Sequence, residues 1–345
     1  MKKPFGAVAP LATALLVTAL LAAPQAHAAA YTLKDAAAAT GRVFGAVVPA
    51  GLLGDADYTK ALDQEFGQIT PENEMKWNVV ERVRGKFDFA AADRLVDHAE
   101  SRGMAVRGSV LAWHSQLPGW VINIGSGAEL LTALREHVAG VAGHFRGRVD
   151  HWNVVNEAFG DSGARRNSVF QERIGESWVE EAFLAAEAAD PTAKLCYNDY
   201  YTDGSGPKSD AVYGLVRDFV ARGVPIDCVG FQGYFNSDHR VPADMAENLR
   251  RFADLGVDVH LTELNVTGSG ETQAKAYAVA VSACLAVPRC TVITVGGVTD
   301  KYYWNAAKTP LLIDADYGRK PAYFSVLDVL NEAATGRRWA RAVVT

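Results

Sequence analysis

Eight short segments rich in β-favouring residues recur along the chain, with helical stretches between them. Regular alternation of strand and helix is typical of parallel sheets, and eight repeats predict a closed (β/α)8 TIM barrel in a single α/β domain. An open, doubly wound sheet is the alternative, but it gives no reason for two distant strands to end in glutamate. The predicted strands are 43–47, 68–70, 105–111, 152–155, 194–197, 228–232, 257–262 and 291–295.

The segments between these strands carry apolar residues at helical spacing. Glycines just past the predicted helix ends, and prolines between the segments, support the same division. The predicted helices are 90–102, 129–144, 177–189, 209–222, 243–255, 272–286 and 323–334.

The N-terminus has the features of a secretory signal peptide. Lys2 and Lys3 precede an apolar run over residues 7–23, and the small residues around 26–28 match a cleavage site. A membrane anchor is the alternative, but no second apolar stretch of spanning length follows residue 30. We therefore expect a signal peptide at 1–28 and a secreted barrel domain at 31–345.

The charge of the chain restricts its partners. The formal net charge is -6, and acidic and basic residues are interspersed rather than grouped in runs. This pattern argues against nucleic acid or anionic lipid as a partner. We expect a monomer with no membrane association once the signal peptide is removed.

Four cysteines are present, an even number for an exported chain, and this favours two disulfides. Spacing alone allows three pairings, and four buried free thiols are the alternative. The residues are Cys196, Cys228, Cys284 and Cys290.

Two predicted strands end in glutamate, at Glu157 and Glu263. In a parallel barrel, the chemistry takes place at the carboxyl ends of the strands. Glycoside hydrolysis needs one acid to protonate the departing oxygen and one carboxylate on the other face of the sugar. Strands four and seven lie across the barrel mouth from each other, so the two carboxyls could approach the roughly 5 Å separation of a retaining enzyme. Taken singly, each glutamate would more often be a salt-bridge partner or a helix cap.

Several stretches resemble the signatures of glycoside hydrolase family 10, the endo-β-1,4-xylanase family. They follow one another in order across nearly the whole mature chain, which makes the resemblance specific for fold and ancestry. The stretches are 70–77 (TPENEMKW), 113–118 (WHSQLP), 152–159 (WNVVNEAF), 227–232 (DCVGFQ), 262–263 (TE) and 299–304 (TDKYYW).

This resemblance implies that Glu157 is the acid/base and Glu263 the nucleophile of a retaining β-glycosidase. The implied substrate is xylan or another β-glycoside, and neither a cofactor nor a metal is implied. Indole rings would cover the C–H faces of the sugars, and polar groups would bind the hydroxyls. The implied substrate-binding residues are Glu72, Asn73, Lys76, Trp113, Asn156, Tyr200, Gln232, Tyr234 and Trp304. The resemblance also pairs Cys196 with Cys228 and Cys284 with Cys290.

Five positions around the expected catalytic sugar depart from the family. Two histidines and two aspartates of the family are replaced by uncharged groups, so the local field at Glu263 must differ. Tyr234 could still donate its phenolic proton to Glu263, and Asn265 could orient that carboxylate. We therefore expect activity with an altered pH profile. The residues here are Ser109 and Tyr234 in place of histidine, Asn153 and Asn265 in place of aspartate, and Gly296 in place of tryptophan.

Gly296 suggests a change of specificity, because an indole exchanged for a hydrogen removes a wall of the sugar pocket. Xylose has nothing at C5 to fill that space, whereas a hexose hydroxymethyl or a branching substituent could. A family member with a widened subsite, acting on a hexose-containing or decorated β-glycoside such as a saponin, is therefore the alternative to a xylanase.

Two further classes of protein were weighed. A sugar-binding pseudoenzyme would keep the aromatic and polar contacts without turnover, but retention of both glutamates argues against it. A metal-dependent barrel hydrolase would need histidines and carboxylates converging at the strand ends. His114 and His260 are the nearest candidates, and His260 has the opposite strand parity to Glu263.

Overall fold

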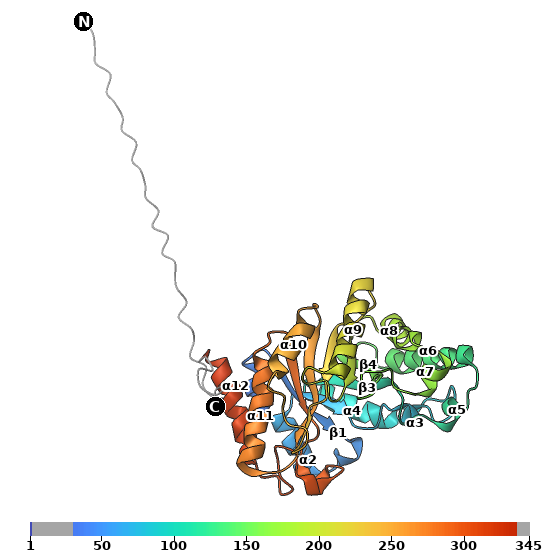
Figure 1. Cartoon of the computed structure of the whole chain (residues 1–345). Helices are drawn as coiled ribbons and strands as arrows, with labels where there is room; N and C mark the ends of the chain where they lie inside the picture. Colours follow the sequence, from blue (N-terminus) through green and yellow to red (C-terminus); the bar gives the residue numbers. More distant parts are fainter. Residues whose placement is uncertain (2–29, 337–345) are drawn as a thin grey trace.

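The computed structural model describes residue 1 and residues 30–336, so the predicted signal peptide lies outside the described part of the chain (Figure 1). Each predicted strand is present to within a few residues. The strands are β1 (Val43–Val48), β2 (Gln68–Pro71), β3 (Ala105–Trp113), β4 (His151–Asn156), β5 (Lys194–Asp199), β6 (Cys228–Phe231), β7 (Tyr234–Phe235), β8 (Asp258–Val266) and β9 (Cys290–Val295).

Eight of these strands close into a parallel barrel, which confirms the predicted fold. β1 pairs with β2 on one side and with β9 on the other, and pairing of β6 with β8 completes the ring. The two-residue strand β7 pairs with the far end of β8, where Tyr234 lies opposite Asn265. That extension brings Tyr234 to the carboxyl end of the barrel.

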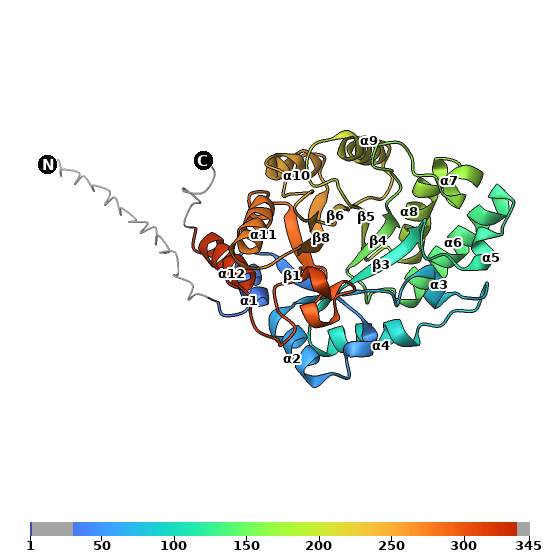
Figure 2. The same cartoon turned by 60° about the horizontal axis from the view of Figure 1, so that its bottom comes forward.

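Helices surround the barrel (Figure 2) and bury their apolar faces against it. The seven predicted helices are all present, and an eighth, α2, was not predicted. The α2 segment buries only Tyr58 and Leu62 as apolar side chains, too few for a clear helical period, although the Asp55 side chain caps its N-terminus. The main helices are α2 (Ala56–Glu65), α4 (Ala90–Ser101), α6 (Gly127–His144), α8 (Ser177–Ala189), α9 (Pro207–Arg222), α10 (Met245–Ala253), α11 (Gly270–Leu285) and α12 (Pro321–Ala334).

Smaller helices precede the barrel and occupy its loops. They are α1 (Leu33–Ala38), α3 (Trp77–Val80), α5 (Gly119–Ile122), α7 (Val169–Arg173) and the 3-10 helices η1 (Ala50–Leu52), η2 (Asp300–Tyr302) and η3 (Ala306–Lys308). No helix in the described residues is both long enough and apolar enough to span a membrane.

The interior of the barrel contains a fully buried cation. Arg107 on β3 is 0 % exposed, and its guanidinium donates to Asn153 Oδ1 on β4 at 2.6 Å and to His260 Nδ1 on β8. Burial lowers the pKa of Arg107 to about 9, and the charge of Glu263 opposes that shift. Burial and the charge of Arg107 also lower the pKa of His260, so its ring is neutral. Arg107 thus has two uncharged hydrogen-bond partners, Asn153 and His260, and its charge interacts with that of Glu263.

Both disulfides pair as the resemblance implied. Cys196–Cys228 joins the neighbouring strands β5 and β6, with 4.4 Å between the Cα atoms. Cys284–Cys290 joins the end of α11 to the start of β9, with 5.3 Å between the Cα atoms.

Candidate active site

Glu157 lies at the carboxyl end of β4, as predicted, whereas β8 continues for three residues beyond Glu263, which therefore lies in the carboxyl-terminal half of that strand. Glu157 directly follows β4 and has the left-handed φ of 58°, which costs a non-glycine residue about 1–2 kcal/mol. Its backbone N–H donates to the Asn198 carbonyl at 2.9 Å, a bond that helps to hold the turn. Glu157 is only 9 % exposed, so its carboxyl points into the molecule rather than into bulk solvent.

Three uncharged donors orient the Glu157 carboxylate. Trp113 Nε1 donates to Oε2 at 3.0 Å, while Asn156 Nδ2 and Gln232 Nε2 donate to Oε1 at 3.0 and 3.1 Å. His114 Nδ1 lies 3.9 Å from Oε2, and burial lowers the pKa of His114 although the Glu157 charge opposes this. The residues around Glu157 therefore fix the position of its carboxylate mainly through hydrogen bonds from uncharged groups.

Glu263 is held by a different set of groups. The Tyr234 hydroxyl donates to its Oε2, as predicted, and Asn198 Nδ2 donates to its Oε1 at 3.2 Å. Burial raises the pKa of Glu263, whereas the Tyr234 bond and the Lys76 charge lower it. Burial and the Glu263 charge raise the pKa of Tyr234 well above its ordinary value, so the phenol remains a donor. The ionised form of Glu263 thus depends on Tyr234 and Lys76.

A relay of amides connects the two carboxylates. Asn198 at the end of β5 donates to Asn156 Oδ1 at 2.8 Å as well as to Glu263, and it accepts from Thr262 Oγ1 at 2.7 Å. Its position requires a glycine at 230, because a Cβ there would lie 2.2 Å from Asn198 Oδ1. Sequence reasoning did not assign Asn198 to the site, although its place at the end of a strand was the available signal.

Lys76 lies on the sugar-binding side of Glu263. Its Nζ donates to Ser109 Oγ at 3.0 Å and to the Ser109 carbonyl at 3.2 Å, and it lies 5.5 Å from the Trp113 ring centroid. Burial lowers the pKa of Lys76, and the charges of Glu263 and Glu157 raise it. Ser109 therefore anchors the cation whose pKa is raised by the charges of both glutamates.

Glu72 and Asn73 follow β2 on the same side. Burial raises the pKa of Glu72, the neighbouring Glu74 raises it further, and Lys76 lowers it. Asn73 is exposed, and its Oδ1 accepts from Gln116 Nε2 at 3.1 Å. Both side chains are accessible to a ligand in the positions that the resemblance implied for sugar binding.

The other side of Glu157 carries Tyr200. Its hydroxyl accepts from Arg166 Nη2 at 2.7 Å, and Arg166 Nε also donates to the Glu157 carbonyl at 2.8 Å. Lys208 Nζ lies 3.2 Å from the Tyr200 ring centroid. Arg166 and Lys208 were not predicted, because the sequence gives no sign that these two basic residues support a tyrosine beside the acid.

The side chain of Asn265 acts differently from expectation. The Asn265 amide donates to the backbone carbonyl of Glu263 at 3.0 Å, so it bonds the main chain and not the carboxylate it was expected to orient. The Asn265 amide bonds the main chain because its side chain turns back along its own strand, toward the Glu263 carbonyl. Asn153 accepts a hydrogen bond from Arg107 without carrying a charge, as expected of an amide at that position.

The space beside Gly296 is small. A pocket of about 20 Å³ lies there, enough for one water molecule, and Glu72, Tyr303 and Trp304 contribute to its lining. A Cβ on Gly296 would lie 3.2 Å from both Asn265 Nδ2 and the Glu263 carbonyl. The volume expected from the missing indole is therefore not open. Trp304 itself is 71 % exposed, and Lys308 Nζ lies 5.4 Å from its ring centroid.

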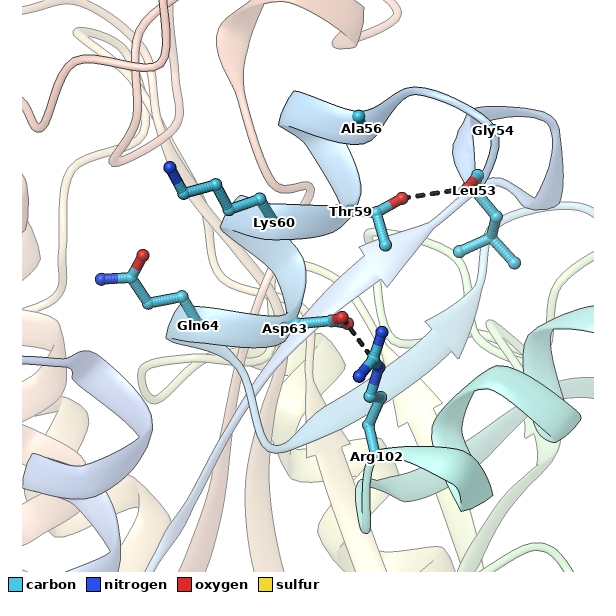
Figure 3. A pocket seen from close by; sticks show the side chains of 8 residues that line it. All are labelled: Leu53, Gly54, Ala56, Thr59, Lys60, Asp63, Gln64 and Arg102. Carbon is cyan, nitrogen blue, oxygen red and sulfur yellow. Dashed lines mark hydrogen bonds and ion pairs between the residues drawn. The ribbon is translucent and has the colours of Figure 1, made fainter.

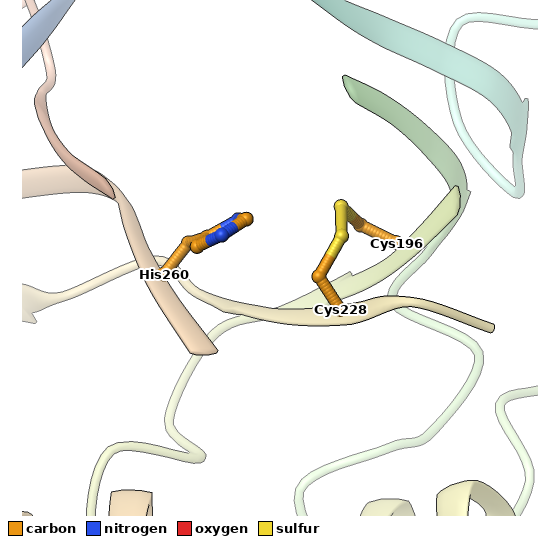
Figure 4. A group of neighbouring side chains, drawn as sticks. All are labelled: Cys196, Cys228 and His260. Atoms are coloured by element: carbon orange, nitrogen blue, oxygen red, sulfur yellow. A yellow bond between two sulfur atoms is a disulfide. The ribbon is translucent and has the colours of Figure 1, made fainter. Parts of the chain in front are cut away.

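One cluster of metal-ligand types occurs in the described part of the chain. Cys196, Cys228 and His260 offer atoms within 4.8 Å of one another (Figure 4). Both sulfurs belong to the disulfide, so neither is a thiolate, the form of cysteine that ligates metals. His260 Nδ1 accepts from Arg107, and its Nε2 lies 3.0 Å from Thr291 Oγ1. The cluster therefore has no donor set for a catalytic metal.

A larger hollow of about 640 Å³ lies on the outer wall of the barrel (Figure 3). It runs from Leu53 and Gly54 along α2 to Arg102, whose Nε lies 2.9 Å from Asp63 Oδ2. None of its lining residues is aromatic, and none was assigned to sugar binding. The hollow lacks the ring platform on which a sugar stacks.

Comparison with known proteins agrees with this geometry. The family model described as glycosyl hydrolase family 10 matches residues 32–329. The chain is 39 % identical to endo-1,4-beta-xylanase 3 of Hypocrea jecorina over 289 residues, which are 83 % of this chain and 82 % of that protein. It is 38 % identical to endo-1,4-beta-xylanase B of Thermotoga neapolitana over 295 residues, 81 % of this chain and 85 % of the relative.

Solved structures give the same result. Native xylanase 10B from Thermotoga maritima has a TM-score of 0.85 and 36 % identity, covering 89 % of this chain and all of that one. Xylanase 10B from Thermotoga petrophila, solved in complex with xylobiose, has a TM-score of 0.85 and 35 % identity, with 89 % and 99 % coverage. The barrel, the two glutamates and matches of this extent place the chain in glycoside hydrolase family 10, as an endo-1,4-β-xylanase-like enzyme.

Proposed function

We propose that the protein is a secreted endo-β-1,4-xylanase that hydrolyses xylan by double displacement with retention at the anomeric carbon. The observation that carries the proposal is the pair of differently held carboxylates joined by the Asn156–Asn198 relay. Glu157 is held by uncharged donors, whereas the pKa of Glu263 is raised by burial and lowered by a phenol and a nearby ammonium.

In the first step, Glu263 attacks the anomeric carbon while Glu157 protonates the departing glycosidic oxygen. The bond to the leaving sugar breaks as the bond to the Glu263 carboxylate forms. Lys76 and Asn156 face the same region and would bind hydroxyls of the sugar under attack. The Tyr234 hydroxyl donates to Glu263 and lowers the pKa that burial raises, so it favours the ionised form that attacks.

In the second step, Glu157 acts as a base and removes a proton from water, which attacks the anomeric carbon and releases Glu263. Gln232 and Trp113 hold Glu157 in one position through both steps, so the carboxyl that gave the proton recovers it from water. Retention of the anomeric configuration follows from the two displacements.

The test is Glu263→Ala with xylan as substrate and release of reducing sugar as the readout. We expect no turnover, with partial rescue by azide, which takes the place of the missing nucleophile. Glu271→Ala is the matched control, because Glu271 is exposed at the start of α11. Full activity of Glu263→Ala would overturn the assigned role, and first-formed products of the α configuration would overturn retention.

Export is the second part of the proposal, supported by the basic start, the apolar run and the small residues of 1–28. Expression of the whole chain in a secreting bacterial host, followed by N-terminal sequencing of the protein in the medium, tests it. We expect a mature N-terminus near residue 29. Retention of the full-length chain inside the cells would contradict export.

The widened-subsite alternative has Gly296 as its one specific support. The pocket there has room for about one water, which favours a pentose over a hexose at the cleavage position. Xylan is therefore the substrate class that we propose first.

A further inference from the structure

We propose that Tyr303 is the residue that determines which sugar fits at the cleavage position, because its ring closes the space that Gly296 leaves open. This inference rests on the proposed function, since it concerns the glycone side of that same site. Neither the resemblance nor the strand pattern had assigned Tyr303 a role.

The position of Tyr303 is defined by its neighbours. It lines the small pocket together with Gly296, Glu72 and Trp304. Burial raises the pKa of the Tyr303 hydroxyl, and the charges of Glu263 and Glu72 raise it further. Charges act on a group in this way only at short range. The pocket that Tyr303 lines therefore brings its ring next to Gly296 and Glu72, on the proposed glycone side of the site.

The segment that carries Tyr303 is anchored from behind. Tyr303 follows the 3-10 helix η2, whose first residue, Asp300, accepts from the Leu311 backbone N–H at 2.7 Å and from Lys320 Nζ at 2.8 Å. Tyr302, which lines the same pocket, donates to Asp55 Oδ2 at 2.7 Å, and its ring contacts Tyr58 of α2 edge-on with 5.9 Å between the centroids. The backbone on the N-terminal side of Tyr303 is thus tied at two points.

Tyr303 and Trp304 form adjoining walls. Their ring centroids lie 5.6 Å apart with 41° between the planes, so the two faces meet at an angle. Tyr303 is half-buried and Trp304 exposed. The exposed ring offers a platform for a sugar, and the half-buried ring limits how far that sugar can extend toward Gly296.

The size of the remaining space gives the specificity. The pocket of about 20 Å³ holds one water, whereas a hydroxymethyl group has two heavy atoms and needs about twice the volume of a water molecule. A xylose unit has only hydrogens at C5 and requires no such space. A hexose would have to displace the Tyr303 ring, so the structure predicts discrimination against glucose at this position.

The experiment compares wild type with Tyr303→Ala on aryl β-xylobioside and aryl β-cellobioside. Exclusion of one methylene-sized group is worth about 10–200-fold in kcat/KM. We expect the preference of the wild type for xylobioside to fall at least tenfold in Tyr303→Ala, mainly through a gain on cellobioside. Tyr303→Phe, which keeps the ring, is expected to retain the preference. Tyr302→Phe is the neighbouring control and should also retain it.

Binding of xylobiose and cellobiose by calorimetry supplies a second readout that does not need turnover. If the wild type hydrolyses neither substrate, the proposed function fails, but a binding preference that Tyr303→Ala removes would still support the role of Tyr303. An equal loss on both sugars, or an unchanged ratio in a folded variant, would overturn the inference.

Discussion

Replacing Tyr234 with phenylalanine is expected to move the acid limb of the pH profile. Tyr234 donates to Glu263, and this bond lowers a pKa that burial raises. The variant keeps the ring and loses only the donor, so the pKa of Glu263 must rise further. Attack requires the ionised carboxylate, and therefore activity should be lost at a higher pH than in the wild type as the pH falls.

The size of the shift follows from the strength of the bond. A hydrogen bond to a charged group contributes about 1.5–3 kcal/mol. At 1.36 kcal/mol per pKa unit, its loss moves the acid limb upward by about 1–2 pH units. At pH values below the acid limbs of both enzymes, kcat/KM of the variant should be about 10–100-fold lower than that of the wild type. At pH values above the variant's acid limb, most of the wild-type activity should remain. Asn198 Nδ2 and the charge of Lys76 remain in the variant and still support the ionised form.

The assay is kcat/KM across pH on an aryl β-xylobioside with an acidic phenol, which needs little protonation by Glu157 and so reports mainly on Glu263. Tyr277→Phe is the control, because it removes a buried hydroxyl that donates to the Pro310 carbonyl at 2.7 Å. The same acid limb in Tyr234→Phe and wild type would refute the reasoning. A uniform loss at every pH would assign Tyr234 a structural role instead.

Two further predictions concern the acid and the disulfides. Glu157→Ala should lower kcat/KM on xylan by about 10²–10⁴ but lower it far less on glycosides of acidic phenols, because only the former need protonation; equal losses on both substrates would contradict an acid role. Loop-closure entropy predicts that removing Cys196–Cys228, which spans 32 residues, costs about 4 kcal/mol of unfolding free energy, against about 2 for Cys284–Cys290, which spans 6. Urea unfolding of the two double-serine variants tests this order, and a larger cost for the short loop would contradict it.

Strand periodicity and motif order were sufficient to predict the barrel and both glutamates. A β-strand that ends in a carboxylate is a local pattern, and the carboxyl ends of parallel strands meet by topology. Helix α2 was missed because its face against the barrel consists of only two apolar side chains. With so few apolar residues, the sequence of α2 shows no clear helical spacing, although the helix packs against the barrel like the others.

The parts of the site that were missed depend on distances between segments far apart in the chain. Asn198 donates to the Glu263 carboxylate and to the Asn156 amide, which come from two other strands, and no single stretch of sequence records those contacts. Glycine in place of tryptophan at position 296 indicated an open pocket, because the sequence does not show which neighbouring side chains surround that position. The structure places Tyr303 in the same pocket, and a change of volume can be interpreted only together with the neighbours that can fill it.

The buried guanidinium of Arg107 has a cost for the whole molecule. Burying a cation in the barrel interior without an anionic contact costs desolvation free energy, and the stabilising interactions of the rest of the fold must offset that cost. Replacing Arg107 alone does not remove this cost, because Arg107→Met leaves Asn153 Oδ1 and His260 Nδ1 buried without a donor. We therefore expect Arg107→Met to melt at a lower temperature, while Glu263 loses a positive neighbour. The melting temperature and kcat/KM of Arg107→Met, each compared with the wild type, test these two effects separately.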